Sequence, residues 1–386
     1  MFETSAIEIS EAALRTNLGF IRQLIGPEIL LSCVIKGNAY GHGIEAYVPM
    51  LQAAGVNHMA VFSADEAVRV LASASEGPPP VVMIMGMLAG EEVEWAVRNG
   101  VEFFVFDLHR LQEAQDAAVR VGMPALIHIE VETGMNRTGF SRTGLADAVA
   151  FLKDHSSDFR IRGLCTHFAG AESIANHVRI RQQLKTFQNF DRWLRKRGVH
   201  PELRHTACSA ATIRYPATRM DMVRIGILQY GFWPSREILI NHISRLPDPV
   251  DPLKRILRWT SQVMSTKSVR QGEFIGYGTT FLAEQDMVIA TVPVGYSHGY
   301  SRSLSNQGRV LIHGQRMSVI GMVNMNMMLV DVTHLDGEVA RGDEVALIGS
   351  QGDLQLTVAS FGELSDQLNY ELLTRLPANI PRRSVD

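Results

Sequence analysis

The stretch that decides the fold is Leu31-Ser32-Cys33-Val34-Ile35-Lys36-Gly37-Asn38-Ala39-Tyr40-Gly41-His42-Gly43. It opens with a short apolar run and continues with turn-forming residues, so the pattern predicts a buried strand over residues 30–36. A lysine at the end of a buried strand is costly unless its ammonium is paired or neutralised. Condensation with a carbonyl cofactor removes that charge, which makes Lys36 a candidate attachment site. The alternative is a lysine that reaches solvent where the strand ends.

Similar apolar runs alternate with helix-like segments through the first 235 residues. A first helix is expected at 9–26, with Ser10 as its N-cap and Gly26 at its end. The predicted strands are 30–36, 58–62, 80–85, 102–106, 125–131, 160–166, 203–208 and 221–224. The predicted helices between them include 64–73, 108–121, 142–155 and 174–198. Eight strands alternating with helices favour an α/β fold closed into a (β/α)₈ TIM-like barrel. An open doubly wound sheet is the alternative, but no Gly-x-Gly-x-x-Gly follows the first strand.

The sequence pattern changes near residue 235, where prolines cluster and strand signals take over. The strands expected beyond this point are 259–269, 287–294, 308–313, 317–322, 327–333 and 344–348, with a final helix-like segment at 355–376. We therefore expect a barrel domain over 10–235 and a mostly β domain over 236–386, with residues 1–9 as a candidate strand of the second domain.

Composition narrows the class of protein. The 386 residues carry a net charge of −3, which gives no support for nucleic acid or an anionic membrane as a partner. No apolar stretch is long enough to span a bilayer, and Glu3 lies where a secretory signal would carry positive charge. The three cysteines are too few and too scattered for a disulfide framework or a zinc site. These features predict a cytoplasmic enzyme or binding protein without a metal.

Polar residues follow several of the predicted strands, and in a barrel such residues meet at one mouth. They are Lys36, Tyr40, Arg137, His167, His205, Ser209 and Arg224. The serine and the segment Arg224-Ile225-Gly226-Ile227 suit a phosphate, because glycine lets backbone N–H groups approach an anion. A phosphate site beside a strand-end lysine indicates pyridoxal 5′-phosphate. Taken alone, Gly226 is equally well explained as an ordinary turn.

The motifs in order along the chain resemble those of one family. They are Val34-Ile35-Lys36-Gly37-Asn38-Ala39-Tyr40-Gly41-His42-Gly43, Glu132-Thr133-Gly134-Met135-Asn136-Arg137, Thr166-His167-Phe168-Ala169, Val223-Arg224-Ile225-Gly226-Ile227, Gly276-Tyr277-Gly278-Thr279-Thr280-Phe281, Val294-Gly295-Tyr296-Ser297-His298-Gly299-Tyr300 and Gly321-Met322-Val323-Asn324-Met325-Asn326. On these grounds the chain resembles alanine racemase, a fold-type III enzyme that uses pyridoxal 5′-phosphate. The resemblance implies a homodimer in which the β domain of one subunit completes the active site of the other.

The resemblance also implies roles for single residues. Lys36 would hold the cofactor and act as the base on one face of the substrate Cα, with Tyr277 of the partner subunit as the base on the other face. Arg224 would face the pyridine nitrogen and contact His167. Arg137 and the Met325 backbone N–H would bind the substrate carboxylate. The remaining cofactor contacts would come from Tyr40, Ser209, Gly226 and Ile227, with His205 and Tyr296 in supporting positions.

The sequence departs from the family pattern at several positions. Glu130 stands where many members have a lysine that is often carbamylated, so we expect it to supply the negative charge beside Arg137. Asn326 and His298 each stand where an aspartate is usual. Ala378 is aligned with a tyrosine that usually lines the pocket, and its loss would widen the substrate side.

Racemisation of alanine is the expected function, and a racemase of broader specificity for serine, lysine or arginine is the alternative. An apolar pocket discriminates one methylene by only ~1–3 kcal/mol, so a wider pocket would reject large side chains poorly. A decarboxylase of the same two-domain type would need a cysteine acid in the β domain, whereas all three cysteines precede residue 209. A cofactor-binding protein without activity would lack the β domain. The sequence therefore favours the racemase.

Overall fold

The computed structural model describes residues 3–245, 247, 249–358 and 369–386. The chain forms two compact units. One contains residues 13–37 and 47–254, and the other contains residues 1–12, 38–46 and 255–386. We call the first the barrel unit and the second the β-rich unit. The domain boundary expected at residue 235 remains a prediction.

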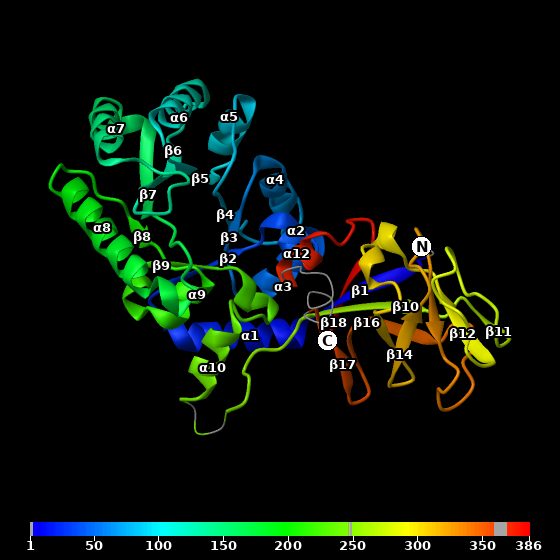
Figure 1. Cartoon of the computed structure of the whole chain (residues 1–386). Helices are drawn as coiled ribbons and strands as arrows, with labels where there is room; N and C mark the ends of the chain where they lie inside the picture. Colours follow the sequence, from blue (N-terminus) through cyan, green and yellow to red (C-terminus); the bar gives the residue numbers. More distant parts are fainter. Residues whose placement is uncertain (1–2, 246, 248, 359–368) are drawn as a thin grey trace. The chain divides into compact units, whose positions relative to one another are not determined.

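The barrel unit is built on eight parallel strands (Figure 1). They are Leu30–Val34 (β2), His58–Val61 (β3), Val81–Ile84 (β4), Glu102–Val105 (β5), Ala125–Glu130 (β6), Phe159–Cys165 (β7), Leu203–His205 (β8) and Met222–Ile225 (β9). Their order in the sheet, β8-β7-β6-β5-β4-β3-β2-β9, leaves β8 and β9 to close the ring. Two backbone hydrogen bonds join them, from Asp221 N to Arg204 O at 3.1 Å and from Arg224 N to Ala207 O at 2.9 Å. The predicted barrel is confirmed.

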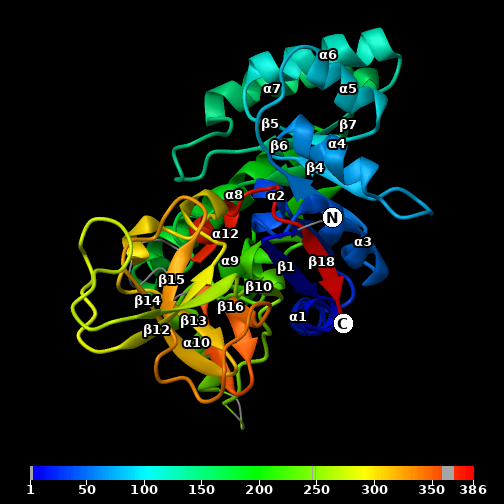
Figure 2. The same ribbon diagram turned by 90° about the vertical axis from the view of Figure 1, so that its right-hand side faces the viewer.

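Helices alternate with these strands, and most of them bury an apolar stripe. They are Glu11–Ile25 (α1), Ile44–Ala53 (α3), Ala64–Ala72 (α4), Glu91–Arg98 (α5), Leu108–Val121 (α6), Arg142–Asp154 (α7), His177–Arg195 (α8), Ser209–Arg214 (α9) and Arg236–Ile243 (α10). The Asp107 side chain caps the start of α6 by accepting the Arg110 N–H, and Gly122 ends that helix at φ 74°. Figure 2 shows α5, α6 and α7 on the outer side of the strands.

The β-rich unit is organised by one sheet of ten strands. They are Ser5–Ser10 (β1), Leu257–Gln262 (β10), Ser265–Val269 (β11), Met287–Val292 (β12), Arg309–Ile312 (β13), Gln315–Ile320 (β14), Met328–Asp331 (β15), Glu344–Gln351 (β16), Leu354–Leu356 (β17) and Arg382–Val385 (β18). Strand β1 lies between β10, which is antiparallel to it, and β18, which is parallel. The predicted second domain, rich in strands, is confirmed as a fold.

Three expectations differ from the structure. The single strand expected at 259–269 is two strands, β10 and β11, with a break at Val263 and Met264. Of the helix expected at 355–376, β17 occupies the start, the described residues contain the helix Asn369–Thr374 (α12), and residues 359–368 lie outside the described part. Lys36 is not the last residue of a strand but the first residue of the short helix Lys36–Tyr40 (α2).

The turn after the first barrel strand explains this last difference. Residues 37–41 all have positive φ angles, from 51° to 83°. This left-handed conformation costs roughly 1–2 kcal/mol for each residue other than glycine, and the apolar and β-branched run that precedes it cannot signal it. The buried His42 ring holds the turn, since its Nδ1 lies 2.8 Å from the Ala39 carbonyl oxygen. The chain therefore leaves the strand at Val34 instead of continuing through Lys36.

No helix within the described residues has the length and apolar character needed to cross a membrane. The cysteines are all unpaired, with Cys33 and Cys165 buried and Cys208 partly buried. Burial raises the pKa of each of these thiols, so they are present as neutral thiols in the barrel wall.

Candidate active site

The carboxyl ends of the barrel strands bring several of the predicted residues together at one mouth. Lys36 follows β2, Arg137 lies on the loop after β6, His167 follows β7 and Arg224 lies on β9. Their charges influence one another: Arg224, Arg137 and Lys36 all help to depress the pKa of His167. The mouth is therefore cationic, and it suits a ligand that carries anionic groups.

Lys36 has a lowered pKa for two reasons. Desolvation by the surrounding protein is the larger cause, and the nearby positive charges of Arg137 and Arg224 add to it, while Glu66 opposes them. The residue as a whole is exposed, so substrate and cofactor can reach its amine. A lysine with a depressed pKa is a stronger candidate nucleophile and base than an ordinary surface lysine.

His167 is held neutral. Burial lowers its pKa to about 3, with Arg224 as the next cause. The Gln183 side chain from α8 fixes the backbone at this point by donating to the His167 carbonyl oxygen at 3.1 Å and accepting the Ala169 N–H at 3.0 Å. The imidazole is therefore available as a neutral group near physiological pH.

The loop that carries Arg137 is fixed by its own backbone and by Glu132. The Phe140 N–H donates to Glu130 O at 2.8 Å and the Glu132 N–H donates to Phe140 O at 3.1 Å, which closes the base of the loop. The Glu132 carboxylate accepts the N–H of Gly134 and, at 2.8 Å, that of Asn136. Arg137 is exposed at the tip of this loop, where it can meet an incoming carboxylate.

Glu130 is buried at 5 % exposure beneath the same loop. Its pKa is raised because burial outweighs the hydrogen bond with Thr138 and the charges of Arg224 and Arg137, all of which lower it. The structure thus brings an acidic side chain into the electrostatic range of both arginines, as the sequence predicts for a substitute anion.

A candidate phosphate cradle lies at the ends of β8 and β9. Ser209 begins α9, and its Oγ accepts the Gly226 N–H at 3.0 Å. Ile227 begins the short 3₁₀ helix Ile227–Tyr230 (η4). Two helix starts therefore meet with a serine hydroxyl between them, and such starts present backbone N–H groups to an anion.

Tyr40 is assigned to the β-rich unit, together with the rest of residues 38–46. It lies on the left-handed turn, at φ 51°. Within the same unit, the Arg382 guanidinium donates to the Gly41 carbonyl oxygen at 3.0 and 3.2 Å and so anchors the end of this turn. The turn fixes where the Tyr40 backbone lies.

The β-rich unit carries the other predicted residues, and most are on its surface. Tyr277 is 71 % exposed and Met325 is 55 % exposed. Tyr296 begins the 3₁₀ helix Tyr296–His298 (η5), and its N–H donates to the Asn324 carbonyl oxygen at 3.0 Å. The two atypical residues also belong to this network: His298 Nδ1 accepts the Gly295 N–H at 3.2 Å, and Asn326 donates to Ser297 Oγ at 2.9 Å. Ala378 lies exposed in the turn before β18.

Several buried polar residues of the barrel unit were not identified from the sequence. Glu66 was hidden because an acidic residue in the first turn of a helix is ordinary. Glu102 and His128 carried a usable signal, since each is a polar residue inside an apolar run of a predicted strand. Both are buried, and His205 lies with them instead of facing the mouth. Within the described residues, no group of three or more potential ligands is placed to hold a metal ion.

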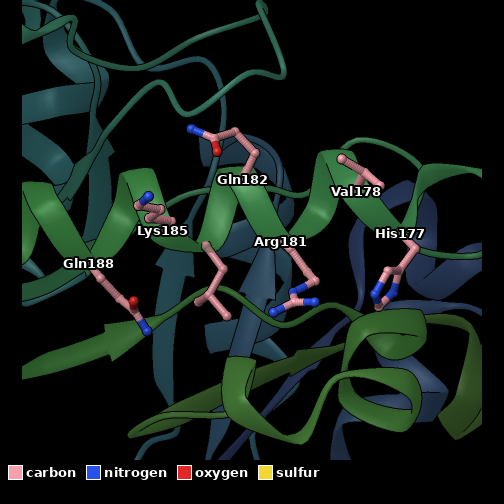
Figure 3. A pocket seen from close by; sticks show the side chains of 7 residues that line it. His177, Val178, Arg181, Gln182, Lys185 and Gln188 are labelled. Atoms are coloured by element: carbon pink, nitrogen blue, oxygen red, sulfur yellow. The ribbon is translucent and has the colours of Figure 1, made fainter.

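A separate hollow of about 470 Å³ lies along the outer face of α8 (Figure 3). It is lined by His177, Val178, Arg181, Gln182, Leu184, Lys185 and Gln188. None of these residues belongs to the constellation predicted from the sequence, so this hollow is distinct from the barrel mouth.

Comparison with known proteins points to one family. Residues 9–234 match the family model described as the alanine racemase N-terminal domain, and residues 256–384 match the alanine racemase C-terminal domain. The alanine racemase of Leptospira interrogans is 33% identical over 383 residues, covering 99% of this chain and 96% of its own length. That of Clostridium perfringens strain SM101 is 33% identical over 377 residues, covering 97% and 94%.

Solved structures agree with these matches. The alanine racemase from Streptomyces lavendulae superposes with a TM-score of 0.89 at 28% identity and covers 100% of this chain and 98% of its own. The alanine racemase from Bacillus anthracis, solved with bound L-Ala-P, gives a TM-score of 0.88 at 30% identity, covering 100% and 96%.

Proposed function

Because the chain belongs to the alanine racemase family, we propose that it interconverts the L and D forms of alanine with pyridoxal 5′-phosphate as cofactor. The observation that carries this proposal is the group at the barrel mouth: Lys36, with its lowered pKa, shares its surroundings with Arg137 and Arg224. The proposed place of action is the cytosol, where the product would supply cell-wall precursors.

The residues at the mouth fit the proposed cofactor. Lys36 would hold it covalently, and the cradle of Ser209, Gly226 and Ile227 would hold its phosphate, with Tyr40 as a further phosphate contact. Because the Ser209 oxygen accepts the Gly226 N–H, its own O–H stays available to donate to a phosphate oxygen. When bound, the cofactor supplies an electron-withdrawing ring that acidifies the substrate Cα–H.

Racemisation requires a proton to leave one face of Cα and return on the other, so two bases are needed. We assign one to the Lys36 amine and the other to the partner subunit's Tyr277. Arg137 would hold the substrate carboxylate, with the Met325 N–H as an additional donor. A carboxylate fixed in this way orients Cα toward both bases.

Arg224 would face the pyridine nitrogen of the cofactor. A guanidinium can donate hydrogen bonds but does not give up its proton in proteins. It would therefore leave that nitrogen unprotonated and weaken the electron withdrawal, which limits side reactions. His167, held neutral beside Arg224, would be able to accept a hydrogen bond from the phenol of the tyrosine base.

A homodimer is part of this proposal because the second base lies on the β-rich unit. Several large side chains of that unit are exposed in the single chain: Phe274, Tyr277, Leu282, Tyr296, Met325 and Met327. A concentration of exposed aromatic and methionine side chains is typical of surfaces that bind another protein. It supports the assignment of this surface to the barrel mouth of a second copy.

Glu130 would take the place of the carbamylated lysine. Its carboxylate needs no added carbon dioxide to be anionic. Burial raises its pKa, and the charges of Arg224 and Arg137 offset part of that rise. We propose that it orients Arg137 and that no carbamylated residue is needed at this position.

The experiment is a chiral assay with alanine, serine, lysine and arginine in D₂O. The expected result is loss of optical rotation with deuterium incorporation at Cα, fastest for alanine. A broad-specificity racemase is the second candidate, favoured by the small Ala378 where the family usually has a tyrosine, and comparable kcat/KM values across the four substrates would establish it.

The same reaction mixtures also test the two remaining alternatives, a decarboxylase and a cofactor-binding protein without activity. Release of carbon dioxide would indicate a decarboxylase, which needs a cysteine acid that the β-rich unit lacks in sequence. Binding of the cofactor with every single-handed amino acid left unchanged would indicate a binding protein and would contradict the proposal.

A further inference from the structure

A line of buried polar groups connects Arg224 to the interior of the barrel. The Arg224 Nη1 makes a short hydrogen bond to His205 Nδ1. His205 Nε2 lies 2.8 Å from His128 Nδ1, and His128 Nε2 lies 2.7 Å from Glu102 Oε2. The four residues come from β9, β8, β6 and β5, and each is 5 % exposed or less. We call these four residues the relay.

The direction of every hydrogen bond in the relay is fixed because Arg224, at one end, can only donate and the Glu102 carboxylate, at the other end, can only accept. An arginine only donates, so His205 Nδ1 must accept, and its proton must lie on Nε2. His128 Nδ1 then accepts that proton's hydrogen bond, and His128 Nε2–H donates to Glu102. Both histidines are therefore neutral Nε2–H tautomers that lie head to tail between a cation and a carboxylate.

Glu102 is in the state this direction requires. Its Oε1 accepts from Arg162 Nε at 2.6 Å, and Oε2 also lies 3.4 Å from His58 Nε2. Burial by itself raises the pKa of Glu102, but the hydrogen bonds from His128 and His58 outweigh it and hold the pKa well below its usual range. Burial lowers the pKa of both His128 and His205. The relay thus holds an anion at one end and neutral rings in the middle.

Phe104 and Gly163 pack beside the rings of the relay. The Phe104 ring lies about 6 Å from the rings of His128 and His205 and from the Arg224 guanidinium carbon, so it covers one side of all three. Gly163 on β7 leaves space beside the two histidine rings. A Cβ there would come within 2.7 Å of His205 Nε2 and still closer to His128 Nδ1.

We propose that Glu102 is a positioning residue for Arg224, which it controls through the tautomers of His128 and His205. With His205 Nδ1 as an acceptor, Arg224 is held by three acceptors, the other two being the carbonyl oxygens of His205 at 2.8 Å and Thr166 at 2.7 Å. If the direction of the hydrogen bonds in the relay were reversed, His205 would carry its proton on Nδ1. That N–H would face the N–H groups of the guanidinium and displace them. The competing interpretation is that the relay only stabilises the barrel.

Glu102→Gln separates these interpretations because an amide has one accepting and one donating end. Arg162 is always charged, so the amide oxygen turns toward it and the amide nitrogen faces His128. His128 then accepts at Nε2 and donates from Nδ1. On the proposal His205 follows and loses its bond from Arg224, because the donor it would otherwise aim at His128 Nδ1 would meet a second donor. The variant is expected to reverse both tautomers without removing any atom of the barrel wall.

The first readout is ¹⁵N NMR of histidine-labelled protein without cofactor. In the parent protein, His128 and His205, assigned by single His→Asn variants, are expected as neutral Nε2–H tautomers. In Glu102→Gln both are expected as Nδ1–H tautomers, and in Glu102→Asp as Nε2–H. Glu202→Gln, which removes a carboxylate from the same Arg162 outside the relay, is the matched control and is expected to leave both unchanged. Unchanged tautomers in Glu102→Gln would overturn the proposal.

The second readout concerns Arg224 and rests on the proposed function. Glu102→Gln is expected to lower kcat by about tenfold or more with little change in KM, since a hydrogen bond to a charged group is displaced, and to shift the visible absorbance of the bound cofactor. Glu102→Asp is expected to restore most of the loss. A parent protein that is itself inactive contradicts the proposed function and leaves the tautomer result standing. Reversed tautomers with unchanged kcat and absorbance would overturn the positioning role.

If Glu102→Gln does not fold, Gly163→Ala carries the test, because its methyl group wedges between the two rings without altering any charge. It is expected to give the same loss of kcat and the same absorbance shift. Gly144→Ala, whose new methyl would meet nothing closer than 3.5 Å, is the control. A folded Gly163→Ala variant with parental kcat and absorbance would overturn the proposal.

Discussion

The two proposed bases lie in very different surroundings. Lys36 follows a barrel strand and is influenced by Arg137, Arg224 and Glu66, all within the barrel unit. Tyr277 lies on the β-rich unit with 71 % of its surface exposed. The charges that act on the lysine are already in place within one chain, whereas the tyrosine faces solvent in the single chain.

On the proposed function, one half of the site would be built by folding and the other by association. A group that must work in a dry, charged environment is costly to place on an open surface, because water screens every interaction there. On the proposed function, the tyrosine would gain such an environment when a second molecule covers it. The contrast can be tested directly.

The largest expected effect is complementation between two inactive variants. Lys36→Ala and Tyr277→Phe are each expected to lose activity, by at least about 10⁴-fold for the lysine, which serves as both attachment point and base. Mixed in equal amounts and allowed to exchange subunits, they are expected to recover about a quarter of the parental activity, because half of the dimers are mixed and each has one complete site. Activity is measured by the chiral assay after refolding the mixture. No recovery would mean that both bases come from one chain.

The second prediction concerns Tyr277→Phe alone. Its kcat is expected to fall by about 10²–10⁴-fold with KM nearly unchanged, since the phenol oxygen acts only in proton transfer. Lys36 remains in place, so one enantiomer is expected to exchange its Cα proton for solvent deuterium without inverting. Mass spectrometry and chiral chromatography of the same sample measure both quantities. Equal loss of exchange for both enantiomers would contradict separate roles for the two bases.

Acid is expected to destabilise the protein, the barrel unit more than the β-rich unit. The barrel holds His128, His167 and His205 with lowered pKa values, that of His167 about 3. Below pH 6.5 the unfolded chain binds protons that these buried rings exclude, so the free energy of unfolding falls as the pH drops. The slope is at most about 1.4 kcal/mol per pH unit for each histidine.

Hydrogen exchange at pH 7.5 and pH 5 measures this for each unit separately. The β-rich unit also contains His42, whose pKa burial lowers to about 4, so some loss is expected there. His167→Gln should flatten the slope in the barrel, while the exposed His200→Gln serves as the control. Equal protection of the barrel strands at both pH values would contradict the prediction.

The sequence predicted the strands of the barrel well because its signals there are local. Apolar runs bounded by turn residues place all eight strands within a few residues, and Gly122 and Asp107 set the ends of α6 by their own chemistry. The left-handed turn at residues 37–41 was missed because only Gly37 and Gly41 favour positive φ angles, while the three residues between them also adopt such angles.

From local pattern alone, residues of the candidate site were predicted only where they follow a strand. Lys36, Arg137 and His167 have that signal, but Glu102 and His128 lie inside strands, and periodicity alone cannot tell which of them meet. Their partners are 26 to 77 residues away in the chain. Such pairs arise from the side-by-side arrangement of β5, β6, β7 and β8, so they become visible only in three dimensions.

The smallest expected effect concerns the β-rich unit and substrate choice. Ala378→Tyr is expected to raise the ratio of kcat/KM for alanine to that for lysine by about tenfold, since a ring that fills the pocket discriminates by ~1–3 kcal/mol. The change should cost little stability, because Ala378 is exposed and the turn around it is held by Arg382, which donates to Pro377 O at 2.6 Å. Asn379→Tyr places the same ring one residue further along and is the control. If both variants change the ratio equally, or neither does, then Ala378 does not set the substrate side, and the specificity must come from the barrel mouth alone.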